Sequence, residues 1–329
     1  MHSYLNYYMK VNWYPLIFEP ILKDRIWGGT KLHSLLNKTL PTTTTGESWE
    51  ISSVPGDSSI IKNGIFQGTT LNDLVAKYPQ EILGKAVYKK FGNQFPLLFK
   101  FLDAQEDLSI QLHPNDELAK KRHNSFGKTE MWYVMQADEN SRIIVGFKEN
   151  SSADEYLRHL EDKTLPTILK EISVKQGDAF FLKTGTIHAI GAGIVIAEIQ
   201  QTSDITYRVY DWDRVDSNGK SRELHVELAL EAINYNEVES QKQYGTIQNE
   251  SNLIVECPYF ITNFIPLDGN VTFHKDSESF TVLMCTDGQF ELTSEGSKSV
   301  FKKGETILLP AAITQYELLG KASILEIYL

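Results

Sequence analysis

Short apolar runs rich in β-branched and aromatic residues recur along most of this chain, and turn-forming residues separate them. Runs of this length and composition are typical of β-strands. The clearest of them cover residues 59–61, 97–102, 131–135, 142–145, 179–182 and 194–200. The same pattern returns at residue 253 and continues to the end of the sequence. We therefore predict a mainly β fold.

Helical patterns are confined to a few insertions between these runs. Thr70 is a potential N-cap for a helix that ends near Pro79, and Ser152 stands in the same way before acidic residues. The predicted helices cover residues 70–79, 114–123, 152–160 and 222–234. Residues 236–251, rich in Gln, Glu, Asn and Ser, show no clear period, which indicates a connector.

The charge balance limits the partners that this chain can have. In 329 residues, 32 Lys and Arg face 43 Asp and Glu, which gives a net charge of −11. This balance argues against a nucleic acid or an anionic membrane as partner, because both require a basic surface. A small anionic substrate would need locally gathered cations. No apolar stretch approaches the roughly 20 residues of a membrane span.

The N-terminus does not resemble a signal peptide, because Pro15, Glu19 and Pro20 interrupt its apolar stretch. We therefore expect a cytoplasmic protein. Residues 1–8 show no pattern that could pack, so we expect translation to start at Met9 and these residues to be dispensable. The two cysteines, Cys257 and Cys285, follow apolar runs without CxxC spacing, and are predicted to be reduced core residues.

Three residues on separate strand-like segments indicate a metal site. They are His113, Glu130 and His188. A lone histidine is more often a hydrogen-bonded core residue, but two imidazoles and a carboxylate suit a divalent transition metal with open coordination positions. Gln111 precedes His113 by two residues, so both side chains lie on one face of a strand and the Gln111 amide oxygen can reach the same ion.

A weak internal repeat predicts the architecture. The spacing Gly177-x5-Lys183-x-Gly185-x2-His188 resembles the second motif of the cupin β-barrel, except that cupins usually have proline at the lysine position. A faded copy begins at Gly304 and places Gln315 at the position equivalent to His188.

The segment at 280–288 is the counterpart of residues 131–138 and brings no His or Glu ligand set. We therefore predict two cupin-type jelly-roll barrels with a few inserted helices. Residues 1–245 form the metal-bearing catalytic domain, with the helical insertions, and residues 246–329 form a metal-free, structural β domain.

Nearly the whole chain resembles the type I phosphomannose isomerases in their short bacterial form. The resemblance is carried by residues 23–29, 46–52, 96–103, 108–114, 128–130, 185–190 and 200–214. Within them, Gln111-x-His113-Pro, Lys128-x-Glu130 and Ser-Asp204 with Arg208 are specific when they occur together. The resemblance implies a small sugar-phosphate substrate and one zinc ion per chain. The implied reaction interconverts D-mannose 6-phosphate and D-fructose 6-phosphate through an enediol.

Such a reaction needs an acid–base group near C1 and C2 of the sugar, an electrophile and a phosphate anchor. A zinc ion with open positions supplies the electrophile. The resemblance places Arg208 in the pocket as the catalytic arginine, where a guanidinium suits an enediolate. The alternative is a surface arginine, or one paired with Asp211 or Asp213.

Lys128 shares a strand face with Glu130 and so points toward the metal. A dication nearby should lower its pKa and suit it to proton transfer, although it could equally hold the phosphate. Glu198 interrupts the apolar run 194–199, which is costly for a carboxylate without a partner or a function. Glu198 and Asp204 remain alternative bases.

Ser109 and Lys100 are predicted to contact the substrate, as is Asp204. Two other functions share the same metal ligands. One is a cupin non-haem iron oxygenase, which would require iron and oxygen and would leave Arg208 and Lys128 without a role. The other is a metal-bearing cupin that binds sugar without turnover. The oligomeric state does not follow from the sequence.

Overall fold

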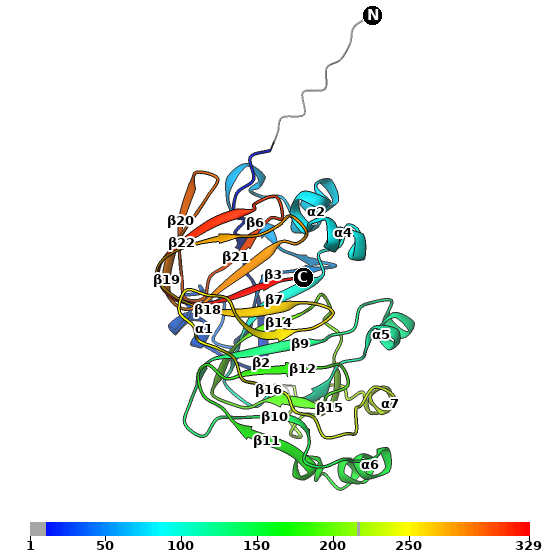
Figure 1. The fold of residues 1–329 in the computed structure, drawn as a ribbon. Helices are drawn as coiled ribbons and strands as arrows, with labels where there is room; N and C mark the ends of the chain where they lie inside the picture. The colour runs from blue at the N-terminus through cyan, green and yellow to red at the C-terminus, as the bar shows by residue number, and fades with distance from the viewer. Residues whose placement is uncertain (1–10, 216–217) are drawn as a thin grey trace, which may run out of the picture.

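The computed structural model describes residues 11–215 and 218–329, and strands dominate it (Figure 1). The predicted mainly β class with few helices is confirmed. The expectations for Met9 and residues 1–8 lie outside the described residues. Among the described residues, the model contains no helix of the length and apolar character needed to cross a membrane.

Two antiparallel sheets form the first barrel. The seven-stranded sheet has the order β16 (Gln241–Lys242), β12 (Ala179–Leu182), β9 (Glu130–Ala137), β14 (Ile194–Gln201), β7 (Leu97–Ala104), β3 (Thr45–Ile51) and β2 (Ile21–Gly29). The five-stranded sheet has the order β11 (Leu169–Ser173), β10 (Arg142–Phe147), β13 (His188–Ile190), β8 (Ile110–Leu112) and β15 (Tyr207–Tyr210).

Alternation along β9 explains how the seven-stranded sheet is buried on both faces. Trp132 and Val134 point into the barrel and pack against Ile143 and Val145 of the five-stranded sheet. Met131, Tyr133 and Met135 point to the opposite face and join a different apolar cluster. Successive side chains of a strand point to opposite faces, so a strand covered on both sides has an unbroken apolar sequence.

A third sheet, in the yellow to red part of the chain, covers that opposite face (Figure 1). Its strand order is β17 (Asn252–Glu256), β18 (Ile261–His274), β22 (Gln315–Tyr328), β19 (Thr281–Ser294) and β20 (Ser297–Lys302), and β21 (Thr306–Leu309) pairs with β19. Leu283 and Cys285 of β19 face this sheet's own interior cluster. Val282 and Met284 pack instead against the first barrel, so the two parts of the chain share one core.

Shorter elements complete the fold. Two small ladders pair β1 (Phe18–Glu19) with β6 (Ile60–Ile61), and β4 (Ser53–Val54) with β5 (Asp57–Ser58). The α-helices are α1 (Lys31–Ser34), α2 (Leu71–Lys77), α3 (Pro79–Leu83), α4 (Lys85–Phe91), α5 (Asp116–His123), α6 (Ala153–Glu161) and α7 (Val226–Leu230). Two 3₁₀ turns cover Gly64–Phe66 and Leu165–Ile168.

Three predicted helices are confirmed, as α2, α5 and α6. Thr70 caps α2 by accepting a hydrogen bond from the Asp73 amide, and Ser152 caps α6 through Glu155. Proline at 79 does not end the helical region but opens α3, since its missing N–H is not needed in a first turn. Helix α4, which follows α3 directly, is not among the predicted helices.

The predicted helix at 222–234 is wrong over most of its length, because only Val226–Leu230 is helical. Arg222 is instead held by both oxygens of Asp211, and the backbone N–H of His225 donates to the Arg208 carbonyl. These contacts hold residues 222–225 against Asp211 and β15 in an irregular conformation. The predicted connector, residues 236–251, is irregular except for β16.

The repeat is visible in the backbone. Gly177 and Gly304 both have φ near +90°, at 91° and 86°, and each precedes a short strand of four residues. His188 begins β13 and Gln315 begins β22. Cys257 and Cys285 are both free thiols, as predicted, although only Cys285 is fully buried.

Candidate functional site

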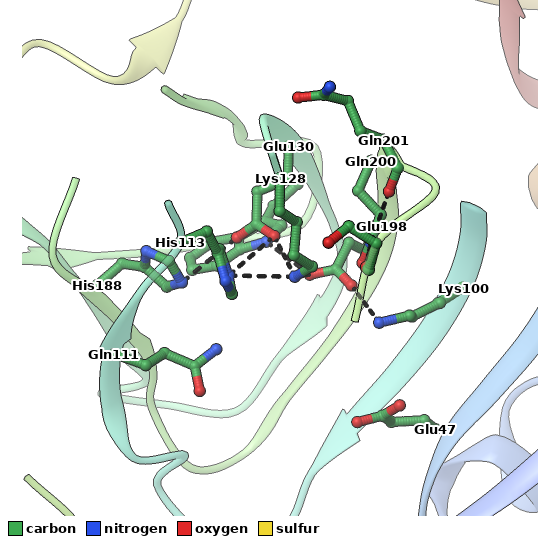
Figure 2. A network of polar contacts seen from close by, with 12 residues as sticks. Glu47, Lys100, Gln111, His113, Lys128, Glu130, His188, Glu198, Gln200 and Gln201 are labelled. Atoms are coloured by element: carbon green, nitrogen blue, oxygen red, sulfur yellow. Dashed lines mark hydrogen bonds and ion pairs between the residues drawn. The ribbon is translucent and has the colours of Figure 1, made fainter. Parts of the chain in front are cut away.

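The three predicted metal ligands meet inside the first barrel (Figure 2). His113 follows β8 and His188 begins β13, both in the five-stranded sheet, while Glu130 begins β9 in the facing sheet. The two Nε2 atoms each lie 3.4 Å from one oxygen of the Glu130 carboxylate. All three side chains are at most 2% exposed. The barrel therefore brings together residues that are 75 positions apart in the sequence.

Hydrogen bonds orient both imidazoles. The Nδ1 atom of His113 lies 2.8 Å from the Ile205 carbonyl, and Nδ1 of His188 lies 2.8 Å from the Thr186 carbonyl. A carbonyl accepts only, so each Nδ1 carries the proton and each neutral Nε2 presents a lone pair. Burial, reinforced by Lys128, lowers the pKa of His113 to about 4, and burial also lowers the pKa of His188.

The donor set fits a divalent metal ion. The buried Nε2 atom of His188 has no hydrogen-bond partner among the residues that the structure describes, which is unusual for a buried polar atom. Neutral imidazoles and a carboxylate are the ligands of catalytic zinc and of similar ions. Gln111 lies directly opposite His188 in the β8–β13 ladder, and its side chain faces the same cavity.

A cavity of about 510 Å³ opens beside this group of ligands. Sites for small molecules have volumes of this order. The predicted residues that line it are Lys100, Ser109, Gln111, Lys128, His188, Glu198, Asp204 and Arg208. His113 and Glu130 lie behind Lys128, within hydrogen-bond distance of its amine. The structure thus brings all ten predicted site residues to one place.

Buried charges alternate in sign along one wall of the cavity. Lys128 Nζ is 2.6 Å from Glu130 and 4.0 Å from Glu198, and Lys100 Nζ is 3.1 Å from the other Glu198 oxygen. Lys100 and Glu198 are direct partners in the β7–β14 ladder, and Figure 2 shows Glu47 beyond Lys100. Each charge therefore has a neighbour of opposite sign, which offsets the cost of burying it.

The alternation of the strands explains why these charges interrupt apolar runs. Glu198 lies on the barrel face of β14 with Ile194 and Ile196, at the end of the barrel where the ligands lie. The Trp132 indole donates to Glu198 Oε1 at 3.1 Å. One end of the barrel interior is apolar and the other is polar.

Lys128 differs from the expectation for a lysine beside a dication. Burial alone would lower its pKa, but the carboxylates of Glu130 and Glu198 outweigh burial and raise the pKa of Lys128. The residues of the protein therefore favour the charged amine, and a lowered pKa would require the charge of a bound dication.

Arg208 is a cation without a carboxylate partner among the described residues. Its Nε donates to Ser109 Oγ at 3.3 Å and its Nη1 donates to the Glu223 carbonyl at 2.9 Å. Asp211, the partner considered in the sequence analysis, is occupied by Arg214 and Arg222 at 2.7 and 2.6 Å. Burial, and then Arg222, lower the pKa of Arg208, so an anion in the cavity would relieve an unfavourable charge.

Sequence reasoning missed several cavity residues. Glu47 and Trp49 of β3 share a strand face, and the Trp49 indole donates to Glu47 at 2.6 Å. Arg25 and Lys100 neutralise Glu47: burial opposes ionisation, yet these cations lower its pKa to about 2. The signal in the sequence is Glu47 itself, a carboxylate two residues before Trp49 and therefore on the same strand face, within the segment 46–52 that carries the resemblance. Arg222 also lines the cavity, but the predicted helix at 222–234 included it and so gave no reason to expect it there.

Comparisons with known proteins agree with this arrangement. Residues 16–142 match the family model "Phosphomannose isomerase type I, catalytic domain", and residues 249–329 match "Mannose-6-phosphate isomerase, cupin domain". Mannose-6-phosphate isomerase ManA of Bacillus subtilis is 37% identical over 315 residues, which cover 94% of this chain and 96% of that protein. The chain belongs to the type I phosphomannose isomerase family.

Another relative and a solved structure also match this phosphomannose isomerase over nearly its whole length. The mannose-6-phosphate isomerase of Streptococcus mutans is 35% identical over 313 residues, 94% of this chain and 97% of that protein. The crystal structure of the mannose 6-phosphate isomerase from Bacillus subtilis superposes with a TM-score of 0.88 at 34% identity, and covers 96% of this chain and 99% of that one.

Proposed function

We propose that this protein is a metal-dependent aldose–ketose isomerase that interconverts D-mannose 6-phosphate and D-fructose 6-phosphate. Membership of the type I phosphomannose isomerase family supports the reaction. The observation that carries the proposal is the buried set His113, Glu130 and His188 beside a cavity in which Arg208 has no anionic partner within 11–215 and 218–329. Such a cavity suits a small anion that must also meet a metal ion.

The proposed metal is Zn²⁺, one per chain, held by His113, Glu130 and His188 with Gln111 as the fourth ligand. When bound, it would act as a Lewis acid that polarises the sugar oxygens at C1 and C2. The carbonyl partners of the two Nδ1 atoms support this assignment, because they hold both imidazoles in the tautomer that can bind a metal.

Proton transfer between C1 and C2 is assigned to the charged wall of the cavity. Lys128 and Glu198 both line the cavity beside the metal ligands, so either can exchange a proton with an enediol intermediate. Arg208 would stabilise the negative charge of the enediolate, and the fixed position of its Nε on Ser109 suits that task. Ser109, Lys100 and Asp204 would contact the hydroxyl groups and the phosphate.

We also propose a division at residues 245 and 246 between a catalytic part and a metal-free part. Gln315, the counterpart of His188, is exposed at the start of β22 rather than directed into the second barrel. The family model for the catalytic domain matches within the first part, and the cupin-domain match begins at residue 249.

Two measurements on one preparation test the function. Atomic emission spectroscopy should find about one zinc ion per chain. A coupled assay that converts the product to glucose 6-phosphate should show turnover of mannose 6-phosphate. Iron with oxygen consumption would favour the oxygenase alternative. Bound metal without turnover of either substrate would favour a sugar-binding protein and refute the isomerase.

A further inference from the structure

A carboxylate outside the cavity links the catalytic wall to the C-terminal sheet. Asp116 is the first residue of α5, and it does not line the cavity. Its Oδ1 accepts hydrogen bonds from the Gly127 amide at 2.8 Å and from the Gln201 side chain at 3.0 Å. Its Oδ2 accepts a hydrogen bond from the Tyr259 hydroxyl at 2.6 Å. One carboxylate thus joins three segments that are distant in the sequence.

Two of these segments enclose Lys128. Gln201, at the end of β14, accepts a hydrogen bond from the Thr129 amide at 2.9 Å, and its own backbone N–H donates to the Thr129 carbonyl. Asp116 holds Gly127, the residue on the other side of Lys128. The backbone around Lys128 is therefore fixed from both sides, while its amine reaches His113 Nε2 at 3.1 Å and Glu130 at 2.6 Å.

The third segment comes from the other part of the chain. Tyr259 lies between β17 and β18 of the C-terminal sheet. Burial and the nearby Asp116 raise the pKa of Tyr259, so its hydroxyl stays protonated and donates. Lys90 approaches the face of the same ring at 5.9 Å. The Tyr259 hydroxyl therefore supplies one of the three hydrogen bonds that hold the Asp116 carboxylate, and the one that comes from the C-terminal sheet.

We propose that Asp116 and Tyr259 are positioning residues through which the C-terminal sheet holds Lys128 in place beside the metal ligands. The kinetic part of this inference rests on the proposed isomerase function, whereas the structural part does not. A displacement of about 1 Å at a reacting group can lower a rate by up to about 100-fold. A single hydroxyl that lies outside the cavity can therefore affect turnover if its loss shifts Lys128.

The first test removes the Tyr259 hydroxyl and keeps its ring. Tyr259→Phe should lower kcat by about three- to tenfold with little change in KM, since the substrate contacts remain. Hydrogen exchange of the peptide that covers residues 125–130 should become faster. Tyr244→Phe is the matched control, because Tyr244 also packs on the C-terminal sheet and donates to the Gly177 carbonyl at 2.5 Å. Tyr244→Phe should leave kcat and the hydrogen exchange of residues 125–130 unchanged.

The second test separates geometry from charge at Asp116. Asn can keep the acceptor for Gly127 and Gln201 and can donate to the Tyr259 oxygen, so Asp116→Asn should stay close to the original protein. Asp116→Ala should lower kcat by about 10- to 100-fold. In the Asp116→Ala background, Tyr259→Phe should have no further effect, because the two residues act in series.

Several outcomes would overturn the inference. One is hydrogen exchange of residues 125–130 in Tyr259→Phe that is no faster than in the Tyr244→Phe control. Another is additive effects of Asp116→Ala and Tyr259→Phe on kcat. Circular dichroism on each variant identifies any that fails to fold. If Asp116→Ala is one of them, kcat and hydrogen exchange of Tyr259→Phe, compared with Tyr244→Phe, decide the inference. If the original protein does not turn over mannose 6-phosphate, the proposed function fails, while the exchange measurement still decides whether Asp116 and Tyr259 hold the segment.

Discussion

The decisive residue for the proposed chemistry is Arg208, and its contacts allow the effect of removing it to be worked out. A guanidinium carries five N–H donors, and the described structure uses two of them, on Ser109 and on the Glu223 carbonyl. The remaining donors are available to an anion in the cavity. Arg208→Ala should therefore lower kcat by ~10²–10³-fold, the loss found when one preorganised donor to a developing oxyanion is removed.

The assay is steady-state kinetics with the coupled enzyme system, with metal content measured in the same preparation. Arg208→Lys should rescue poorly, because an ammonium cannot reproduce the planar fork. Arg158→Ala, at an exposed position of α6, is the control and should have no effect. A defect confined to KM would show that Arg208 anchors the phosphate instead. If neither kcat nor KM changes, Arg208 has no role in the reaction.

Three further predictions follow from other groups. Removing the metal with a chelator should abolish turnover, and zinc should restore it at about one ion per chain. A zinc content near two ions per chain, unchanged in Gln315→Ala, would contradict a metal-free C-terminal part. Since the pKa of Glu47 is about 2 in the folded protein, its charge stabilises the fold above pH 4.5 by up to about 3 kcal/mol, and this stabilisation is lost as the pH falls toward 2. Glu47→Gln should flatten that acid limb in denaturant melts, and an unchanged pH profile would refute the ion-pair account. Burial raises the pKa of Cys285 to about 12, so a thiol reagent at pH 8 should modify Cys257 alone in the native protein. Mass spectrometry locates the label, and modified Cys285 would contradict its burial.

The metal ligands could be predicted because each stands in a local motif with its own periodicity. In β9, alternation assigns Glu130 to the same face as Trp132 and Val134, and this face is the barrel interior. Glu198 interrupts an apolar run, so it could be recognised as costly before its partner Lys100 was known. Helix prediction failed at 222–234 for the opposite reason, because Asp211 and Arg208 hold residues 222 and 225 by tertiary contacts that no local pattern reveals.

Periodicity and residue type settle which face of a strand is buried and which residue types are available there, because both are local properties of the chain. They settle the β class, the donor set and the repeat. Which charges become neighbours depends on strand register and on how the sheets face each other. Packing therefore decides the ion pair of Lys100 with Glu198, the hydrogen bond of Arg208 with Ser109, and the contact of Tyr259 with Asp116 across 143 residues. Burial then sets their energies, since the same charges would interact weakly in water.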